Sequence, residues 1–315
     1  MSHEVESMFP GNREVPWHKL GTVVEGRLNA ADAIEAAGLD WTVVLSSIYT
    51  NWTDENDRPI TIDVPNKYAT VRETDGRVLG VVGQRYEVIQ NEDLFGFLDA
   101  IVESDDAHYE TAGSLRHGGT VWMLLKPNAD EINIDGDRME QYLLATTSHD
   151  GTSSVVVRPV ITRVVCANTL ALGLAESQSE FRARHTRSAT SKIDEARTAL
   201  RMTLRYRDEF EAYAKRLAAV EMSLSEQHSV VEKLVPAGET EREERIREKV
   251  RDSIFESLAG PFIQPNHKRN AWGLLQAVND YELWTQGSDK TRSERQALKA
   301  VRGYGLTTRA RNLLG

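Results

Sequence analysis

The sequence is poor in cysteine, in long apolar runs and in basic charge. Its 315 residues include one cysteine, Cys166, so no intrachain disulfide can form and a multi-thiolate metal site is excluded. No apolar run approaches the roughly 18–20 residues that cross a bilayer. The first residues are acidic and lack the basic-then-apolar order of a secretory signal. These absences predict a cytoplasmic protein with no membrane association.

Charge is acidic overall but unevenly placed. The chain has 38 Lys and Arg against 48 Asp and Glu, a net charge of −10. This balance argues against binding of duplex DNA, because contacts to phosphates supply much of that affinity. Residues 1–160 carry a balance of −15, whereas residues 161–216 carry +4 and residues 268–315 carry +5. A local basic track on an acidic body is therefore allowed, although a solvated helical surface rich in Arg and Glu would give the same counts.

The first half of the chain shows the patterns of strands with few helices between them. Ile60 to Val64 alternates apolar and polar residues, as a half-buried strand does. Asp75-Gly76 is a hairpin turn signal between residues 67–72 and 78–82. The other predicted elements are helices at 30–37 and from Asn91 to about 102, and strands at 41–49, 109–115, 120–125, 141–147 and 153–165. This order predicts an α+β fold in residues 1–180, an antiparallel β-meander with helices on one side.

The second half has a helical period. Apolar residues are spaced alternately by three and four, which predicts one long heptad-like helix. Its stripe consists of Ile193, Ala196, Leu200, Thr203, Phe210, Ala214, Leu217 and Leu224. Capping patterns predict further helices that begin near Ser223, Thr240, Asn270 and Asp289, with Gly303 and Gly305 ending the last. The sequence therefore predicts a helical region over residues 188–315.

Residues that could perform covalent chemistry are few. Cys166 with His149 and Asp150 is the one set that resembles a nucleophile with a base, but two adjacent residues cannot orient each other as a triad does. A lone cysteine at the end of an apolar strand typically packs as a small hydrophobe. The histidines are scattered, and no glycine-rich loop precedes a helix. The sequence predicts a protein that is not an enzyme and has no metal or cofactor, with a hydrolase as the alternative.

Arginine and aromatic residues gather where the sheet pattern gives way to the helical pattern. The candidate nucleic-acid-binding residues are Phe181, Arg182, Arg184, Arg187, Arg201, Arg205 and Tyr206. Arg201 and Arg205 are four residues apart and share one helix face. A row of arginines with interleaved aromatics can follow a single-stranded backbone and stack bases without reading sequence. An amphipathic helix whose polar face favours Arg is the alternative.

Several motifs resemble a known family. Ser148-His-Asp-Gly-Thr-Ser-Ser154 with the stretch from Arg158 to Leu170 is similar to the phage/plasmid-like family of unknown function. Other similar stretches are Pro16 to Gly21, Gly83 to Glu92, Tyr109 to Leu115 and, weakly, Asn270 to Asn279. The resemblance implies a phage or plasmid setting and no assigned reaction. The element order also resembles the core of phage single-strand annealing proteins of the Erf and Redβ type, an analogy of fold that implies rings or filaments around single-stranded DNA.

Two functions follow as hypotheses. The leading one is a phage DNA-metabolism accessory protein that binds single-stranded DNA without sequence specificity and anneals strands as a homo-oligomer. The alternative is a protein-binding module that inhibits a host nuclease or defence protein, since the −15 balance of residues 1–160 could dock a basic partner. The turn at His149 and Asp150 is the most exposed candidate for recognition, beside its role in joining two strands.

Overall fold

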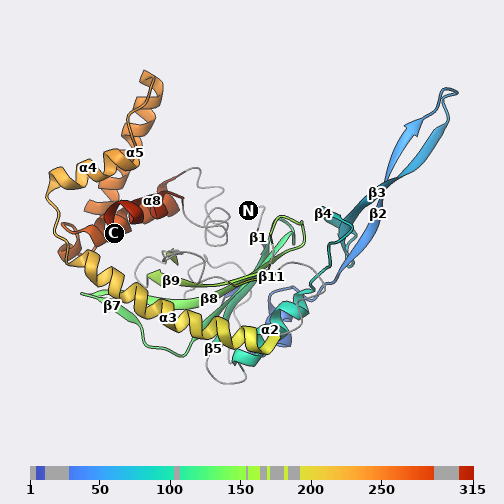
Figure 1. The fold of residues 1–315 in the computed structure, drawn as a ribbon, viewed down its shortest axis with the longest axis horizontal. Coiled ribbons are helices and arrows are strands. Elements are labelled where there is room, and N and C mark those ends of the chain that lie inside the picture. The colour runs from blue at the N-terminus through green and yellow to red at the C-terminus, as the bar shows by residue number, and fades with distance from the viewer. Residues whose placement is uncertain are drawn as a thin grey trace.

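The computed structural model describes the chain in eight stretches. These are residues 5–10, 28–102, 107–153, 155–163, 169–170, 181–183, 192–286 and 305–315. Strands dominate the first half and helices the second, so the predicted α+β class is confirmed. Two antiparallel sheets and the helices that pack on the larger one make up the described part (Figure 1).

The larger sheet contains eight of the described strands, in the order β1-β5-β6-β8-β9-β10, with β7 paired to β8 and β11 paired to β9. Its strands are β1 (Val5–Pro10), β5 (Ala107–Leu115), β6 (Thr120–Pro127), β7 (Ile132–Ile134), β8 (Asp137–Ser148), β9 (Val155–Arg163), β10 (Thr169–Leu170) and β11 (Phe181–Ala183). The meander β5-β6-β8-β9 confirms the predicted antiparallel topology. The three-residue strand β7 was not predicted, because it is too short to show a period.

The smaller sheet has the order β2-β3-β4. Its strands are β2 (Val43–Thr53), β3 (Pro59–Arg72) and β4 (Arg77–Gly83). The predicted turn at Asp75-Gly76 is confirmed, with Gly76 at a φ of 69°. The segments 60–64 and 67–72, predicted as two strands, form the single strand β3, which passes through Asn66 at a φ of 59°. The hairpin of β2 and β3 (residues 43–72), here called the β-arm, projects from the rest of the molecule (Figure 1).

The helices that pack on the larger sheet lie on one of its faces, and the other helices pack on these. The described helices follow in chain order. They are α1 (Ala30–Ala36), α2 (Asn91–Val102), α3 (Lys192–Ala218), α4 (Leu224–Leu234), α5 (Glu241–Ala259), η1 (Pro265–His267), α6 (Ala271–Asp280), η2 (Tyr281–Thr285) and α8 (Gly305–Leu314). On β8, Leu143 and Ala145 belong to a core with α1 and α2, and Met139 belongs to a core with α3 and α6. These three residues alternate along one strand and therefore point to one face. The prediction of helices on one side of the sheet is confirmed for the described residues.

The helical region is present but differs from the prediction at two places. The long helix α3 ends at Ala218, and Leu224, the last residue of the predicted stripe, is 61% exposed on α4. The buried members Phe210, Ala214 and Leu217 pack within the chain's own core, so this part of the stripe is not free for contacts between subunits. The predicted helix at 289–302 lies outside the described residues.

The last helix begins where the sequence predicted an end. Gly305 starts α8, and the buried carboxylate of Glu282 accepts hydrogen bonds from the backbone N–H groups of Leu306 and Thr307, at 3.2 and 2.8 Å. A carboxylate from another element thus satisfies the first-turn donors of α8. Glu282 lies 24 residues before Leu306 in the sequence, so no local pattern showed this contact. Gly305 by itself therefore suggested the end of a helix.

Candidate functional site

The histidine of the His-Asp-Gly turn is buried. His149 follows β8 and is fully buried, so the expected exposure of this residue is wrong. Its Nε2 lies 3.0 Å from the Asn91 carboxamide oxygen, and its ring meets Trp41 edge-on at 5.4 Å between centroids. Its backbone carbonyl accepts the Thr70 hydroxyl at 2.6 Å. The imidazole therefore joins β8 to α2 and β3, which is a structural position.

The acidic residue of the turn is engaged within it. The Asp150 carboxylate lies 3.3 Å from the Arg116 guanidinium and accepts both the backbone N–H and the hydroxyl of Thr152, at 2.9 and 2.5 Å. Its side chain is 13% exposed. Arg116 lies in the β5–β6 turn, where Arg116 and His117 both have positive φ. Asp150 therefore fixes two turns against each other.

The smaller sheet packs directly on this turn. A Cβ atom added to Gly80 of β4 would lie 2.5 Å from the Cα atom of Asp150, so no side chain fits there. The Tyr86 hydroxyl donates to the backbone carbonyl of Ser148 at 3.0 Å. Burial, together with the nearby Asp150 carboxylate, raises the pKa of Tyr86 above its ordinary value, so the phenol keeps its proton as a donor. We use the name arm junction for the residues that meet here, which are Trp41, Thr70, Gly80, Tyr86, Asn91, Ser148, His149 and Asp150.

Two further contacts hold the β-arm at its base. The Gln90 carboxamide oxygen accepts a hydrogen bond from the backbone N–H of Val43, and its NH2 group donates one to the backbone carbonyl of Val43, both at 2.9 Å. The buried Arg72 guanidinium lies 5.4 Å from the centre of the Trp41 ring and pairs with Asp75 at 2.6 Å. The hydrogen bond from Arg72 lowers the pKa of Asp75 to about 2. The motif segments around residues 83–91 and 148–151 thus converge on the arm junction.

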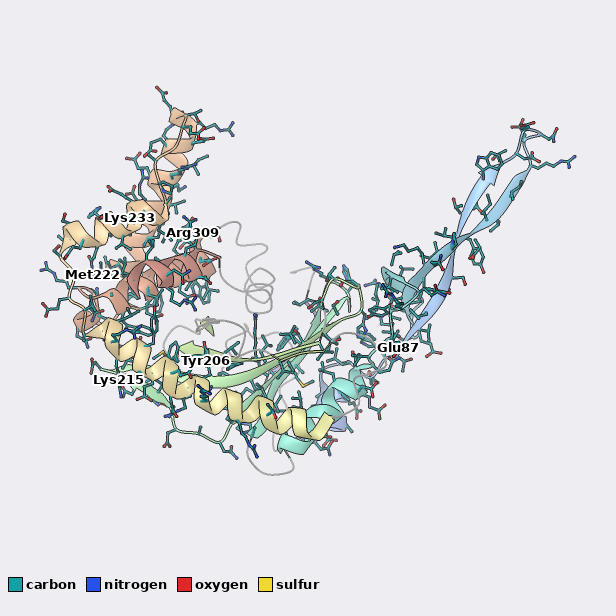
Figure 2. All side chains as sticks on the ribbon, in the orientation of Figure 1. Glu87, Tyr206, Lys215, Met222, Lys233 and Arg309 are labelled. Carbon is teal, nitrogen blue, oxygen red and sulfur yellow. The ribbon has the colours of Figure 1, made fainter. Side chains whose placement is uncertain are left out.

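The β-arm itself is solvent-exposed along most of its length. Figure 2 shows its side chains standing out from both faces of the ribbon, and Glu87 marks its base. Large apolar residues are exposed here, with Trp52 at 58%, Ile60 at 40% and Ile62 at 44%. The tip is closed by the Asp54 carboxylate, which accepts the backbone N–H groups of Asn56 and Arg58. A rigid base and an ordered tip therefore present an apolar hairpin to solvent.

The nominated nucleic-acid-binding residues do not form one lane in the described part of the chain. Arg201 and Arg205 are exposed on α3, but Arg205 pairs with Glu209 at 2.9 Å. Tyr206 is 2% exposed and stacks on Phe210, so it presents no ring face to a base. Phe181 and Arg182 belong to β11, which pairs with β9, whereas Arg184 and Arg187 lie outside the described residues.

The described residues show no arrangement that supports the hydrolase alternative or a metal site. Cys166 lies outside the described residues, and His149 is held by Asn91 in the arm junction. Over the described residues, no group of three or more His, Cys, Asp or Glu side chains could hold a metal ion. None of the described helices combines the length and apolar character that a bilayer crossing requires.

The β-arm is the exposed element that the sequence reasoning missed. Strands were predicted at 41–49 and 60–64, but not their pairing into a hairpin that leaves the body. The available signal was the pair of large apolar residues Trp52 and Ile62 on either side of the polar segment 53–58. An amphipathic strand pattern does not say whether its apolar face is covered.

Comparison with protein families found one match. The family model described as "Domain of unknown function (DUF932)" matches residues 78–302. This range includes β4, the arm-junction residues from Gly80 onward and α3 to η2. The searches of curated proteins and of solved structures gave no match.

Proposed function

Because the chain belongs to the DUF932 family, whose description assigns no activity, we propose its function from its geometry: it is a non-enzymatic docking protein that binds another protein chain through its β-arm. We propose that the protein acts in the cytoplasm of a host cell that carries the phage or plasmid. A host nuclease or defence protein is one such partner, for which the acidic first half of the chain offers a complementary charge.

The single observation that carries this proposal is where exposed apolar side chains gather. Eight of the thirteen large hydrophobic residues exposed in the described part lie on β2, β3 and β4. They are Val44, Leu45, Tyr49, Trp52, Ile60, Ile62, Val78 and Val81. Of these residues, Trp52, Ile60 and Ile62 are neighbours on one face of the hairpin, since Trp52 pairs with Ile60 and Thr50 with Ile62, whereas Tyr49 lies on the opposite face. An exposed apolar surface of this kind typically marks an interaction site. A two-stranded hairpin alone is at best marginally stable in water, so a partner that covers it also stabilises it.

The proposal is tested by changing the apolar face alone. Trp52→Ser with Ile62→Ser should reduce retention of a stoichiometric partner from host lysate by at least about ten-fold, because buried aromatic anchors dominate interface energies. Tyr49→Ser is the matched control, since Tyr49 is 62% exposed and pairs with Asp63 rather than with an apolar residue. Equal retention by the wild type and the double variant would contradict docking through the arm.

A second candidate is binding of single-stranded DNA, supported by cations on α3 and α8. Arg201, Arg216 and Arg309 form no ion pair with a carboxylate in the described part of the chain. The stretch 305–315, which includes Arg309 (Figure 2), contains no acidic residue. Arg216 lies over the ring of Tyr213 at 5.3 Å. Together with the nominated arginines at 182, 184 and 187, these cations could neutralise phosphates.

Salt dependence tests this second candidate. Affinity for a fluorescent oligothymidine should fall steeply between about 50 and 200 mM salt, and Arg182→Ala, Arg184→Ala and Arg187→Ala together should reduce the salt slope by about 2. Arg242→Ala with Arg245→Ala on the exposed part of α5 is the control and should leave the slope unchanged. Fluorescence anisotropy measures both quantities. Absence of binding at the lower salt concentration would exclude the DNA function.

A further inference from the structure

The β-arm has one open edge. In the smaller sheet β2 pairs with β3 alone, and within the described part of the chain no strand lies on its other side. From Val44 to Thr53 its residues are exposed or half-buried. Successive residues of an antiparallel strand turn their backbone N–H and C=O groups alternately toward the partner strand and away from it. Every second residue of β2 therefore offers a donor and an acceptor along this edge.

Gln90 shows which way the backbone of β2 faces at the base of the arm. Its carboxamide binds both the N–H and the C=O of Val43, each at 2.9 Å, so Val43 faces away from β3. By the alternation, Leu45 and Ser47 face away as well. One side-chain amide thus already meets this edge as the peptide unit of an added strand would.

The tip shows the direction for the outer half of β2. The backbone N–H of Asp54 donates to the carbonyl of Arg58 at 3.0 Å, so Asp54 faces the returning chain. The register shifts between Ser47 and Tyr49, and the alternation in the outer half is therefore counted back from the tip. The residues of this half that face away from β3 are Tyr49, Asn51 and Thr53.

The two long edges of the arm differ in what protects them. The sequence of β2, VVLSSIYTNWT, contains no proline, glycine or charged residue. The outer half of β3 contains Pro59 and Pro65, which have no N–H to donate, and the charged Asp63. Proteins use proline and charge to prevent an exposed edge strand from pairing with another chain. Because β3 has this protection and β2 lacks it, β2 is the edge on which a strand can be added.

The backbone groups along this edge also decide the chemistry of the partner. Donors and acceptors that alternate in one line match the backbone of an extended polypeptide. A phosphodiester backbone presents acceptors only, and the backbone groups of a helix are already bonded to one another. An extended protein segment is therefore the class of ligand that satisfies both kinds of group.

We propose, building on the docking function above, that the partner adds an extended segment to the outer edge of β2 as a fourth strand of the smaller sheet. Side chains on one face of that segment pack beside Trp52, which is 58% exposed. The tip favours a basic residue at the end of the segment, because it carries the acidic residues Asp54, Glu55 and Asp57.

Amide hydrogen exchange of the free chain, measured by NMR, tests whether the edge is open. Asn51 and Trp52 are neighbours whose backbone groups face opposite ways. The Trp52 amide should therefore be protected at least about ten-fold more than the Asn51 amide. The N–H of Val43, which Gln90 accepts, should also be protected. Equal protection at Asn51 and Trp52 overturns the open edge.

A peptide probe tests strand addition itself. The probe is an acetylated and amidated peptide of three Val-Thr repeats with a lysine at each end. At millimolar concentration it should slow exchange at Tyr49, Asn51 and Thr53 by at least about ten-fold. Exchange at Thr50 and Trp52, which face β3, should not change. Uniform protection along β2, or none, overturns the proposal. The same peptide with prolines in place of its threonines is the control and should not bind, because it lacks the donors.

Two proline variants give a matched comparison. Asn51 and Thr61 are directly paired, and the Thr61 hydroxyl donates to the Asn51 carboxamide at 3.2 Å, so either substitution removes the same side-chain contact. The backbones of both residues face away from the opposite strand, so neither proline removes a hydrogen bond of the arm's own ladder. Asn51→Pro should raise the dissociation constant of the probe at least about ten-fold, whereas Thr61→Pro should change it by less than about three-fold. Equal effects of the two variants overturn addition at β2.

Capture from host lysate distinguishes strand addition from docking in general. A partner that is lost with Trp52→Ser and Ile62→Ser, but is retained by Asn51→Pro, overturns strand addition and leaves the docking function standing. A partner that is lost with Asn51→Pro but not with Thr61→Pro supports both. Retention by all of these variants overturns both.

Discussion

Gly80→Ala should separate the β-arm from the body and lower the free energy of unfolding by about 2–4 kcal/mol. The added methyl group would lie 2.5 Å from the Cα atom and 2.7 Å from the carbonyl oxygen of Asp150. These are backbone atoms of a turn that Arg116 and Thr152 also hold, so they cannot rotate away as a side chain can. The smaller sheet must shift, and the Thr70 hydrogen bond to His149 is the first contact that the shift stretches.

Chemical denaturation with hydrogen exchange over residues 68–86 measures this effect. Exchange should accelerate in β3 and β4 before the larger sheet is affected. Gly83→Ala is the matched control on the same strand, because nothing lies within 4 Å of a Cβ atom added there. That variant should be neutral or slightly stabilising. Equal destabilisation by the two substitutions would show that the close approach to Asp150 is not the reason why position 80 excludes a side chain.

Trp272→Phe should lower the free energy of unfolding by about 2–4 kcal/mol. Trp272 of α6 is fully buried, and its indole N–H donates to the carboxylate of Asp137 at 3.0 Å. Asp137 begins β8 and is fully buried as well, so the substitution removes a donor from a buried carboxylate in addition to leaving a void. The ring also meets Phe210 of α3 edge-on at 5.9 Å. One side chain therefore joins the helical region to the larger sheet.

The measurement is again an unfolding curve, with a tryptophan-to-phenylalanine change elsewhere as its control. Trp52→Phe alters the exposed arm and should change the free energy of unfolding by less than about 0.5 kcal/mol. Asp137→Asn in the Trp272→Phe background should recover part of the loss, because the buried charge is removed. If Trp272→Phe behaves like Trp52→Phe, the contact between α6 and β8 contributes nothing to stability.

Local signals in the sequence were sufficient for most elements. The alternation at Ile60 to Val64 gave a strand, and the capping box at Ser223 and Glu226 gave the start of α4 with both of its hydrogen bonds. Each signal lies within a few residues of the element that it specifies. The Asp75-Gly76 turn was predictable for the same reason.

Burial and long-range contacts were not predictable in this way. His149 is polar and follows a strand, as an exposed turn residue would, but its partner Asn91 lies 58 residues earlier. Tyr206 follows Arg205 on a helix, and the pattern placed both near one basic surface, whereas the aromatic ring packs inward on Phe210. For the candidate site, the sequence identified the conspicuous motifs but assigned them to recognition. Their contacts place them at the base of the β-arm.

The pairing of β1 imposes an order on the assembly of the larger sheet. Val5 pairs with Leu115, so β1 leaves the ribosome more than a hundred residues before its partner β5. The smaller sheet and helices α1 and α2 lie between them in the chain and depend on shorter sequence separations. During synthesis, β1 must therefore wait unpaired while the arm hairpin, which closes between Thr53 and Pro59, forms from adjacent residues.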